Sequence, residues 1–383
     1  MRILHTADWH LGKLFYGGYL TEDQAYVLTQ QFLPMVRDEK IDAVILAGDV
    51  YDRSLPPAEA VELFDEIATK VTAELHVPFF LISGNHDSAA RLSFGNRLLE
   101  QAGLHIYGEL EKLRGPVMVE DIAGPLAIIP LPFAEPALVR HFFHADDVTD
   151  HEGALRHLMT AQCQGVPQGM RTIAIAHAFI AGGKGSESER PLSIGGTDVV
   201  PSSLFDRFTY TALGHLHGPQ QAGSPTIRYA GSLLKYSFGE AKQKKGAVVV
   251  DIDGTGTVET TFLPFTPKRD VRVVTGLFDD IMAQDDERPD DFLLVRLEDT
   301  EPILDGMAKI RKKYPHALAL ETPNRQYAAT HERNIHVQGV SEQALFAQFT
   351  TTMRAAQPLS EAEQSCLNHL WQRLVDDEGD GLL

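Results

Sequence analysis

The chain has 383 residues, enough for two or three domains, and its 43% of hydrophobic residues provides for a substantial core. A formal net charge of −19 excludes binding of nucleic acid through a broadly basic surface, although metal ions or a partner could attract phosphate locally. Only two cysteines occur, and no run approaches the roughly 20 apolar residues of a membrane span or forms a signal peptide. We therefore expect a cytoplasmic protein without disulfides or a membrane segment.

Short apolar strands alternate with helical segments over the first 253 residues. The spacing of apolar residues predicts helices at about residues 21–40, 57–75, 89–102 and 135–162. Residues 180–196 are rich in Gly and Ser and predict a mobile loop. Strands are predicted at residues 2–6, 43–47, 77–83, 127–131, 172–176, 209–213, 228–232 and 246–253. The alternation predicts an α/β layered fold, with antiparallel pairing in its later part.

A second region follows a proline-rich linker at residues 264–267. Its predicted strands (residues 271–275, 292–297 and 317–321) and helices (near 277–284 and 302–313) indicate a small α+β domain without a catalytic cluster. Two terminal helices are then predicted, and they either pack on their own domain or bind a partner. The first would carry Ala344, Leu345, Phe349 and Met353, and the second, with a capping box of Ser360 and Glu363, would carry Leu367, Leu370, Trp371 and Leu374.

Five of the predicted strands release polar residues that can bind metal at their C-terminal ends. These residues are Asp8 and His10, Asp49, Asn85 and His86, His177, and His215 and His217. Ligands of α/β sheets bind outside the carboxyl ends of the strands, so we expect these side chains to converge. Oxygen donors mixed with imidazoles suit Mn²⁺, Fe²⁺, Zn²⁺ or Mg²⁺, whereas the absence of cysteine from the set disfavours a structural zinc site.

The number of candidate ligands matches the needs of a two-metal centre. Two metals roughly 3.5–4 Å apart that share a carboxylate can clamp a phosphate ester for hydrolysis. An isolated histidine is more often a surface or core residue than a ligand. Five clusters that all follow apolar strands favour the metal centre.

The motifs Asp8-x-His10, Gly48-Asp49, Gly84-Asn85-His86-Asp87, His177 and Gly214-His215-x-His217 together resemble the signature of the calcineurin-like metallophosphoesterases. The longer stretches at residues 8–12, 47–52 and 84–88 resemble the bacterial SbcD nuclease family within this superfamily. The resemblance implies a layered β-sandwich metallophosphoesterase core flanked by helices over residues 1–265. It further implies an α+β capping domain for DNA recognition at 270–338 and helices at 340–383 that dock the coiled coil of an SbcC-like ATPase.

The resemblance also implies the roles of the site residues. Two Mn²⁺ ions are expected, with Mg²⁺, Fe²⁺ or Zn²⁺ as other possibilities. The ligands would be Asp8, His10 and His217 for one metal and Asn85, His177 and His215 for the other, with Asp49 as the bridge.

His86 would donate a proton or stabilise the transition state, and Asp87 would orient it. Asp52 stands where relatives often have a histidine; it either orients His86 or stabilises the turn.

The resemblance implies a Mn²⁺-dependent DNA exonuclease and endonuclease that acts on double-stranded ends and hairpins in repair and recombination. A phosphatase or small-molecule phosphodiesterase on the same core is the alternative, and a scaffold for the ATPase is a third interpretation. The helices near 57–75 and 89–102 would form a homodimer, as in the family, or simply pack on the sheet. Candidate phosphate contacts, which could equally be solvated surface, are Lys242, Lys244 and Lys245, and Lys268 with Arg269 at the linker.

Overall fold

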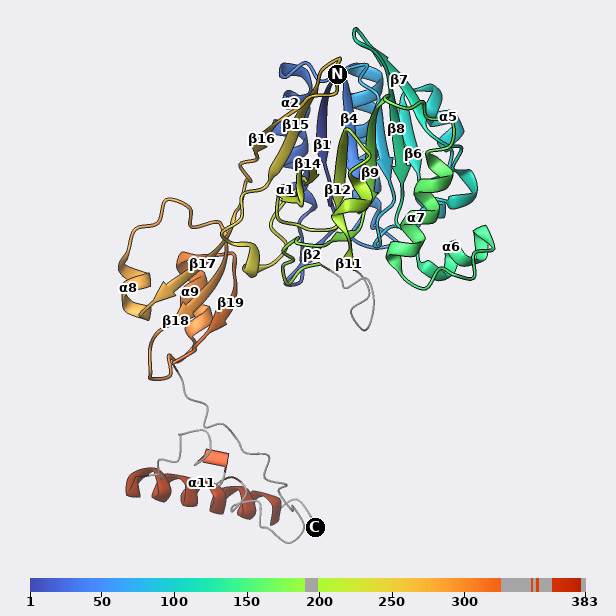
Figure 1. Cartoon of the computed structure of the whole chain (residues 1–383). Helices are drawn as coiled ribbons and strands as arrows, with labels where there is room; N and C mark the ends of the chain where they lie inside the picture. The colour runs from blue at the N-terminus through green and yellow to red at the C-terminus, as the bar shows by residue number, and fades with distance from the viewer. Residues whose placement is uncertain (190–198, 325–345, 347–348, 351–359, 380–383) are drawn as a thin grey trace. The chain divides into compact units, whose positions relative to one another are not determined.

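The computed structural model describes residues 1–189, 199–324, 346, 349–350 and 360–379, with side chains excepted from 371 onward. Two compact units are present: Met1–Val273 with Asp290–Leu293, and Val274–Pro289 with Leu294–Leu383. The first unit contains two sheets that lie face to face, with helices on the outside (Figure 1). The predicted α/β layered fold is therefore confirmed.

The first sheet is six-stranded, in the order β16-β15-β1-β4-β5-β6. Strands β1, β4, β5 and β6 are parallel, whereas β15 is antiparallel to both β1 and β16, as expected for the later part of the chain. Because β1, β4 and β5 are parallel, the loops that follow them emerge at one edge. The strands span Arg2–Thr6 (β1), Ala43–Ala47 (β4), Phe79–Ile82 (β5), Leu104–Tyr107 (β6), Gly246–Ile252 (β15) and Val258–Pro264 (β16).

The second sheet is also six-stranded, in the order β13-β14-β12-β9-β8-β7. Its four central strands are parallel, and antiparallel strands close both edges. The strands span Val117–Asp121 (β7), Gly124–Leu131 (β8), Arg171–His177 (β9), Tyr210–Gly214 (β12), Gln220–Ala222 (β13) and Ser224–Tyr229 (β14). Two small pairs complete the unit: β2 (Leu14–Phe15) with β3 (Gly18–Tyr19), and β10 (Phe179–Ile180) with β11 (Val199–Val200).

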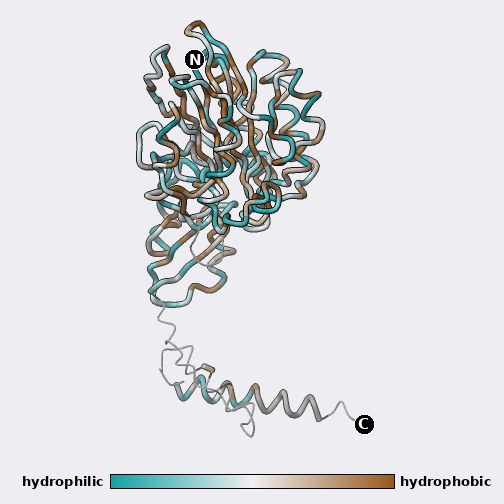
Figure 2. Tube along the Cα trace, turned by 45° about the vertical axis from the view of Figure 1, so that its right-hand side comes forward, coloured by the Kyte–Doolittle hydropathy of each residue, from teal (hydrophilic) through white to brown (hydrophobic). Residues whose placement is uncertain are grey.

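One hydrophobic core lies between the two sheets. Ala43, Ile45 and Ala47 of β4 face it from one side, and Ile173 and Ile175 of β9 from the other. Successive side chains of a strand point to opposite faces, and helices cover the outer faces, so all five residues of β4 are buried. Figure 2 shows many hydrophobic segments in the interior of this unit. The sequence of β4 is therefore a continuous apolar run in which apolar and polar residues do not alternate.

Helices α1 and α3 and their continuations cover the first sheet. The Trp9 ring packs edge-on against Phe32 and Phe64, at centroid distances of 5.3 and 6.4 Å. Val61 was expected on the buried face but is 45% exposed, because the inward stripe runs through positions 60, 63, 64, 67, 68 and 71, and Val61 lies one position off it. The segments are α1 (Thr21–Val27), the π-turn η1 (Leu28–Phe32), α2 (Leu33–Asp38), α3 (Ala58–Thr69) and the π-turn η2 (Lys70–Glu74).

The single helix expected at residues 89–102 is divided in two, α4 (Ala89–Leu92) and α5 (Asn96–Gln101). Gly95 between them adopts φ 69°, a left-handed conformation that no continuous α-helix contains. The outer face of the second sheet is covered by α6 (Pro136–Phe143) and α7 (His151–Gln162), as predicted. Short 3₁₀ turns lie at Leu110–Lys112 (η3), Ser202–Phe205 (η4) and Phe238–Glu240 (η5).

The chain beyond residue 270 forms a three-stranded sheet in the order β17-β18-β19, with two helices. The strands match the predicted ranges, whereas the second helix begins at Gly306, later than expected. The elements are β17 (Val271–Gly276), α8 (Phe278–Ala283), β18 (Phe292–Leu297), α9 (Gly306–Lys313) and β19 (Ala317–Glu321). This is the small α+β region that the sequence predicts.

The last described helix, α11, spans Glu361–Gly379. Its predicted capping box is present: the Ser360 N–H donates to Glu363 Oε2 at 2.8 Å, and the Glu363 N–H donates to Ser360 Oγ at 3.4 Å. Most of the preceding predicted helix, including Ala344, Leu345 and Met353, lies outside the described residues, as do the side chains of Trp371 and Leu374. None of the described helices is long and apolar enough to span a membrane.

Candidate metal centre

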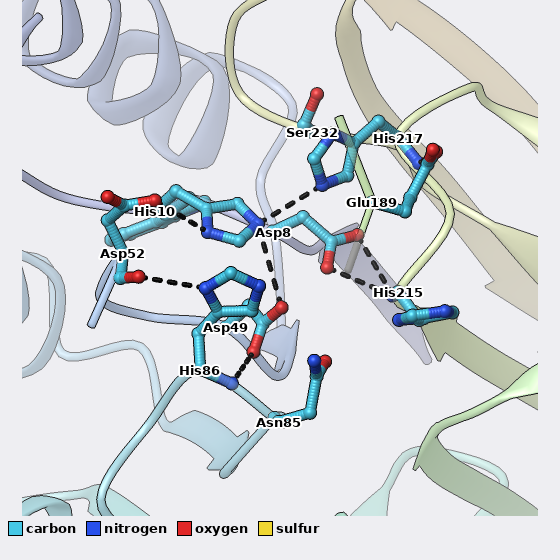
Figure 3. A network of polar contacts seen from close by, with 12 residues as sticks. Asp8, His10, Asp49, Asp52, Asn85, His86, Glu189, His215, His217 and Ser232 are labelled. Carbon is cyan, nitrogen blue, oxygen red and sulfur yellow. Dashed lines mark hydrogen bonds and ion pairs between the residues drawn. The ribbon is translucent and has the colours of Figure 1, made fainter. Parts of the chain in front are cut away.

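All seven expected metal ligands lie together at one edge of the two sheets. Figure 3 labels six of them, and the seventh, His177, lies with its Nε2 2.9 Å from Asn85 Oδ1. The first sheet contributes the loops after β1, β4 and β5, and the second contributes the end of β9 and the loop after β12. The residues are Asp8 and His10, Asp49, Asn85, His177, and His215 and His217. Convergence at the carboxyl ends of parallel strands is what the sequence predicted.

One group of potential ligand atoms comes from Asp8, His10 and His217, and these atoms lie within 4.8 Å of one another. The Nε2 atoms of His10 and His217 are 3.1 Å apart. The other ring nitrogen of each histidine faces a carboxylate, with His10 Nδ1 3.6 Å from Asp52 and His217 Nδ1 3.3 Å from Glu240. A ring that faces a carboxylate through Nδ1 offers its Nε2 lone pair to a metal, which is the usual arrangement of metal-bound histidine.

A second group contains Asp8, Asp49 and His177, also within 4.8 Å. His177 Nδ1 donates to the Ala47 carbonyl at 2.9 Å, so that Nε2 is turned toward Asn85 Oδ1 at 2.9 Å and Asp49 Oδ2 at 3.4 Å. The same Asp49 oxygen lies 3.5 Å from Nε2 of His10 in the first group. Asp49 thus belongs to the second group and also lies next to His10 of the first, as a bridging carboxylate would, while Asp8 is a member of both groups.

His215 lies beside the second group. Its ring packs edge-on against His177 with centroids 5.4 Å apart, and its backbone N–H donates to Asp8 Oδ1 at 2.9 Å. The loop after β12 therefore holds the Asp8 carboxylate through its backbone while its two histidine rings face the site.

The donor set fits divalent cations. The Asp8 and Asp49 side chains are almost completely buried, yet within the described part of the chain neither is paired with a lysine or arginine. Burial raises the pKa of Asp8 well above its usual range and lowers the pKa of His10 to about 4. At His177, by contrast, burial is outweighed by the neighbouring Asp49 carboxylate, which raises the pKa of His177 to about 9. Metal binding needs the neutral imidazole and the ionised carboxylate, so a bound cation would displace these protons and offset the cost of burying the carboxylates.

Several ligand residues adopt backbone conformations that are rare outside glycine. Asp8, His10, Asp49 and His215 have φ values of 52°, 45°, 50° and 101°. Each such residue costs of order 1–3 kcal/mol and persists where surrounding structure enforces it, often at functional sites. The strain here coincides with the residues that aim donor atoms into the centre.

Two glycines allow the loops to approach one another closely. A Cβ atom on Gly84 would lie 2.1 Å from Asp49 Oδ1, and one on Gly48 would lie 2.3 Å from His177 Nδ1. Any side chain at these positions would displace a ligand. The Gly-Asp and Gly-Asn-His-Asp motifs therefore have a packing reason in addition to a chemical one.

His86 lies at the same site but is only partly buried. Its Nδ1 donates to the Asp52 carbonyl at 2.8 Å, and its backbone N–H donates to Asp49 Oδ1 at 2.9 Å. Its ring meets that of His10 edge-on, with centroids 4.7 Å apart. With Nδ1 committed to the carbonyl, Nε2 is the atom left to act on a substrate.

The expectation that Asp87 orients His86 is wrong. The Asp87 carboxylate instead accepts hydrogen bonds from the backbone N–H groups of Gly84, Val50 and Tyr51, at 2.9, 3.1 and 2.9 Å. Those bonds join the loop after β5 to the loop after β4. A four-residue motif does not reveal which backbone groups from another strand its last carboxylate will meet.

His86 is oriented by residue 52, but through the backbone carbonyl rather than the carboxylate. The Asp52 carboxylate forms an ion pair with Lys13 at 2.8 Å and lies near His10 Nδ1. Burial opposes its ionisation, yet His10 and Lys13 lower the pKa of Asp52 to about 2. Asp52 thus supports both a predicted ligand and the predicted catalytic histidine.

Of the three lysines in the predicted basic cluster, two are exposed and one is buried. Lys242 and Lys244 are exposed, but Lys245 is only 5% exposed, paired with Glu240 at 2.6 Å, and donates to the His217 carbonyl at 2.7 Å. Lys245 therefore cannot contact DNA as expected, because its side chain is buried just before β15 begins.

Lys268 and Arg269 are engaged with acidic residues of α1. Lys268 pairs with Glu22, and Arg269 binds the buried Asp23 with its Nε at 3.0 Å. Their charges are compensated within the protein.

Sequence reasoning missed the residues behind His217. Ser188 Oγ lies 2.6 Å from His217 Nδ1, and Glu189 Oε1 accepts the His217 N–H at 2.8 Å. They belong to the described part of the predicted Gly/Ser-rich loop, which therefore contacts the site; residues 190–198 lie outside the described part. The Tyr236 ring packs edge-on against those of His10 and His217. Glu240 and Tyr236 carry no recognisable motif, so no sequence signal indicated them.

Comparison with known proteins agrees with this geometry. Residues 1–147 match the family described as "Calcineurin-like phosphoesterase", and residues 267–354 match "Type 5 capsule protein repressor C-terminal domain". The chain is 34% identical over 99% of its length to the SbcD component of the SbcCD nuclease from Staphylococcus epidermidis, covering 100% of that protein. It is 33% identical over 91% of its length to the corresponding protein from Staphylococcus saprophyticus, covering 92%.

One similar solved structure is only distantly related to this chain. The structure titled "GAP50 the anchor in the inner membrane complex of Plasmodium" aligns with a TM-score of 0.40 at 12% identity, over 69% of this chain and 84% of that one. A similarity of this size supports no argument about function.

The two sheets with their convergent ligand set define a calcineurin-like metallophosphoesterase, a phosphodiester hydrolase that uses divalent metal. Within that class, the chain belongs to the SbcD family, the nuclease components of SbcCD.

Proposed function

We propose that this protein is a Mn²⁺-dependent DNA exonuclease and endonuclease that cleaves phosphodiester bonds at double-stranded ends and hairpins through a two-metal centre. The observation that supports it most is the Asp49 carboxylate, one oxygen of which lies 3.5 Å from Nε2 of His10 in the first group and 3.4 Å from Nε2 of His177 in the second. A bridging carboxylate is the feature that distinguishes a two-metal site from a single-metal site. Mg²⁺, Fe²⁺ and Zn²⁺ would be accepted by the same donors.

The residues of the chain would divide the chemistry as follows. Bound cations would lower the pKa of water and neutralise charge on the phosphate. Asp8, His10 and His217 would hold one cation, and Asn85, His177 and His215 the other. His86, oriented through Nδ1 by the Asp52 carbonyl, would direct Nε2 to the scissile phosphate and, when protonated, donate to it or to the leaving oxygen.

One assay separates the nuclease from the alternative phosphatase or small-molecule phosphodiesterase. Purified full-length protein with Mn²⁺ is given linear duplex DNA, hairpin DNA and bis-p-nitrophenyl phosphate, with an Asp49→Asn variant as control. The proposal predicts that both DNA substrates are cut and that the control is inactive. Hydrolysis of the small ester alone would identify the alternative, and inertness toward all three would favour a scaffold.

We further propose that a second copy of this chain binds in the apolar groove near α3 and α4. The groove has a volume of about 830 Å³ and is lined by Leu55, Val61 and Phe94 among others, and the Phe94 side chain is 83% exposed. Phe94→Glu should convert a dimer to a monomer in light scattering, whereas Ile122→Glu, exposed elsewhere, should not. A dimeric Phe94→Glu protein would count against this surface.

The terminal helices are proposed to bind an SbcC-like ATPase. The relatives are named as subunits of SbcCD, and in the described part of α11 the apolar Leu370 is 51% exposed. Leu370→Glu should weaken binding of the partner's coiled coil in calorimetry, whereas Leu304→Glu, an exposed leucine elsewhere, should not. Equal weakening by both variants would contradict this docking site.

Lys242 and Lys244 are proposed to contact DNA phosphate, because both are exposed. Replacing both with alanine should lower the dependence of DNA affinity on salt concentration, by about one ion per lysine lost. An unchanged salt dependence would exclude them.

A cytoplasmic location is also proposed, since both cysteines are free.

A further inference from the structure

A buried charged cluster lies directly behind the metal ligand His217. It consists of Glu240 at the end of η5, Lys245 immediately before β15, and Ser188 in the loop after β10. The Glu240 side chain is completely buried. A buried ion pair does not by itself indicate a gain in stability. The position of this pair behind a metal ligand is therefore better explained by a role at the metal centre.

Glu240 is the hydrogen-bond acceptor of this cluster, and its neighbours are the donors. Glu240 Oε2 lies 2.6 Å from Lys245 Nζ and accepts the Tyr236 N–H at 3.1 Å. Glu240 Oε1 accepts the Ser188 hydroxyl and lies 3.3 Å from His217 Nδ1. Because the lysine partner keeps the carboxylate ionised, Glu240 can only accept hydrogen bonds.

This arrangement of donors and acceptors determines the proton position on His217. Ser188 has a single hydroxyl proton, which it donates to Glu240, so its Oγ can only accept from His217 Nδ1 at 2.6 Å. Nδ1 must then carry the proton, and Nε2 is left with its lone pair toward His10 and Asp8. Lys245 also holds the His217 backbone carbonyl at 2.7 Å, and Glu189 holds its N–H at 2.8 Å.

We propose that Glu240 is a positioning residue for the metal centre, which through Ser188 fixes the Nδ1–H tautomer of His217, with Lys245 maintaining the charge of Glu240. The proposal rests on the proposed two-metal function. Carboxylates that accept from metal-bound histidine typically contribute 10–100-fold in metal affinity.

The test uses Glu240→Gln in the metal-free full-length protein. A glutamine side chain can either accept or donate, so it no longer selects one tautomer of His217. Calorimetric titration with Mn²⁺ should show affinity reduced about 10–100-fold. As a matched control, Asp270→Asn breaks the Lys235–Asp270 pair, 2.8 Å apart in the same unit but away from the ligands, and should leave affinity unchanged.

A second readout separates positioning from general loss of structure. Two-bond ¹H–¹⁵N spectra of histidine-labelled protein report which ring nitrogen carries the proton, and His217→Asn assigns the signal. The wild type should show Nδ1–H at His217. Glu240→Gln should raise the Nε2–H form, whereas Asp270→Asn should not.

A double variant addresses the lysine that Glu240→Gln leaves unpaired. In Glu240→Gln with Lys245→Met, thermal stability should recover while Mn²⁺ affinity stays low. Affinity that recovers together with stability would overturn the positioning role, as would an unchanged tautomer in Glu240→Gln. Failure of the wild type to bind Mn²⁺ at all would instead contradict the proposed function.

Discussion

His86 occupies a different position in the site from the seven ligands. It is only partly buried, and its Nδ1 is bound to the Asp52 carbonyl at 2.8 Å, although its ring also lies close to His10 and Asp49. The proposal assigns it to the substrate rather than to a metal. His86→Ala should therefore abolish DNA cleavage while leaving the Mn²⁺ stoichiometry, measured by elemental analysis, unchanged. Loss of metal in His86→Ala would make His86 a ligand and refute this assignment.

Gly84 is a residue at which a very small change should have a large effect on the site. A Cβ atom there would lie 2.1 Å from Asp49 Oδ1, so Gly84→Ala must displace the proposed bridging carboxylate. We expect Mn²⁺ affinity in calorimetry to fall by at least the roughly 10–100-fold typical of disturbed metal ligands. Gly18→Ala, where the added Cβ has only an ordinary contact at 3.8 Å, is the matched control. Wild-type affinity in Gly84→Ala would show that the loops can move apart.

At the scale of single residues, the sequence predicts which side chains could bind metal better than it predicts which groups hydrogen-bond to those side chains. Asp8 and His10 could be assigned because each strand end places its own side chains at the shared edge. The roles of Asp87 and Lys245 could not, because their partners are backbone groups and side chains brought in from other strands. Such partners depend on loop conformation rather than on local residue type.

Among the secondary-structure elements, α7 has a well-defined beginning. Asp150 precedes it and accepts the Gly153 N–H at 2.8 Å, while buried Leu155 and Leu158 pack on the second sheet. Asp150→Ala should destabilise the protein by about 1 kcal/mol, the usual cost of a lost cap. Urea unfolding measures the change. Asp146→Ala, at an exposed acidic residue of the same connection, should change stability little, and equal losses in both variants would contradict the capping role.

The strands were easier to predict than the helices that cover them. Strands buried on both faces contain uninterrupted apolar runs, as in β4 and in residues 173–176 of β9. The helical range 89–102 was predicted as one helix, but Gly95 adopts a left-handed conformation and divides it. Gly95 itself was the available signal. Residue type alone could not show that Val61 faces outward, because valine is equally typical of a buried helix face. Val61 lines the apolar groove that is proposed to bind a second copy of the chain.

For the molecule as a whole, one buried ion pair should govern part of the acid stability. Arg171 on β9 binds Asp121 at the end of β7 through two bonds of 2.6 and 2.9 Å. The Arg171 guanidinium, against the effect of burial, holds the pKa of the Asp121 carboxyl well below its usual range. Asp121→Asn should cost about 1.5–3 kcal/mol at neutral pH, as expected for hydrogen bonds between charged groups.

The pH dependence has a definite sign. A carboxyl whose pKa is lowered on folding stabilises the protein fully above its unfolded pKa of about 3.9, and that contribution is lost as pH falls toward the folded value. The difference in unfolding free energy between wild type and Asp121→Asn should therefore be constant above about pH 5 and shrink below about pH 4. Urea unfolding at several pH values measures it, and a difference that grows on acidification would contradict the ion pair.

The central claim is that the residues around Asp49 hold two divalent cations. Anomalous diffraction from crystals of the full-length protein soaked in Mn²⁺ tests it most directly. We predict two peaks roughly 3.5–4 Å apart on either side of the Asp49 carboxylate. One should be bound by Asp8, His10 and His217, and the other by Asn85, His177 and His215. A single peak, or peaks away from Asp49, would contradict the account.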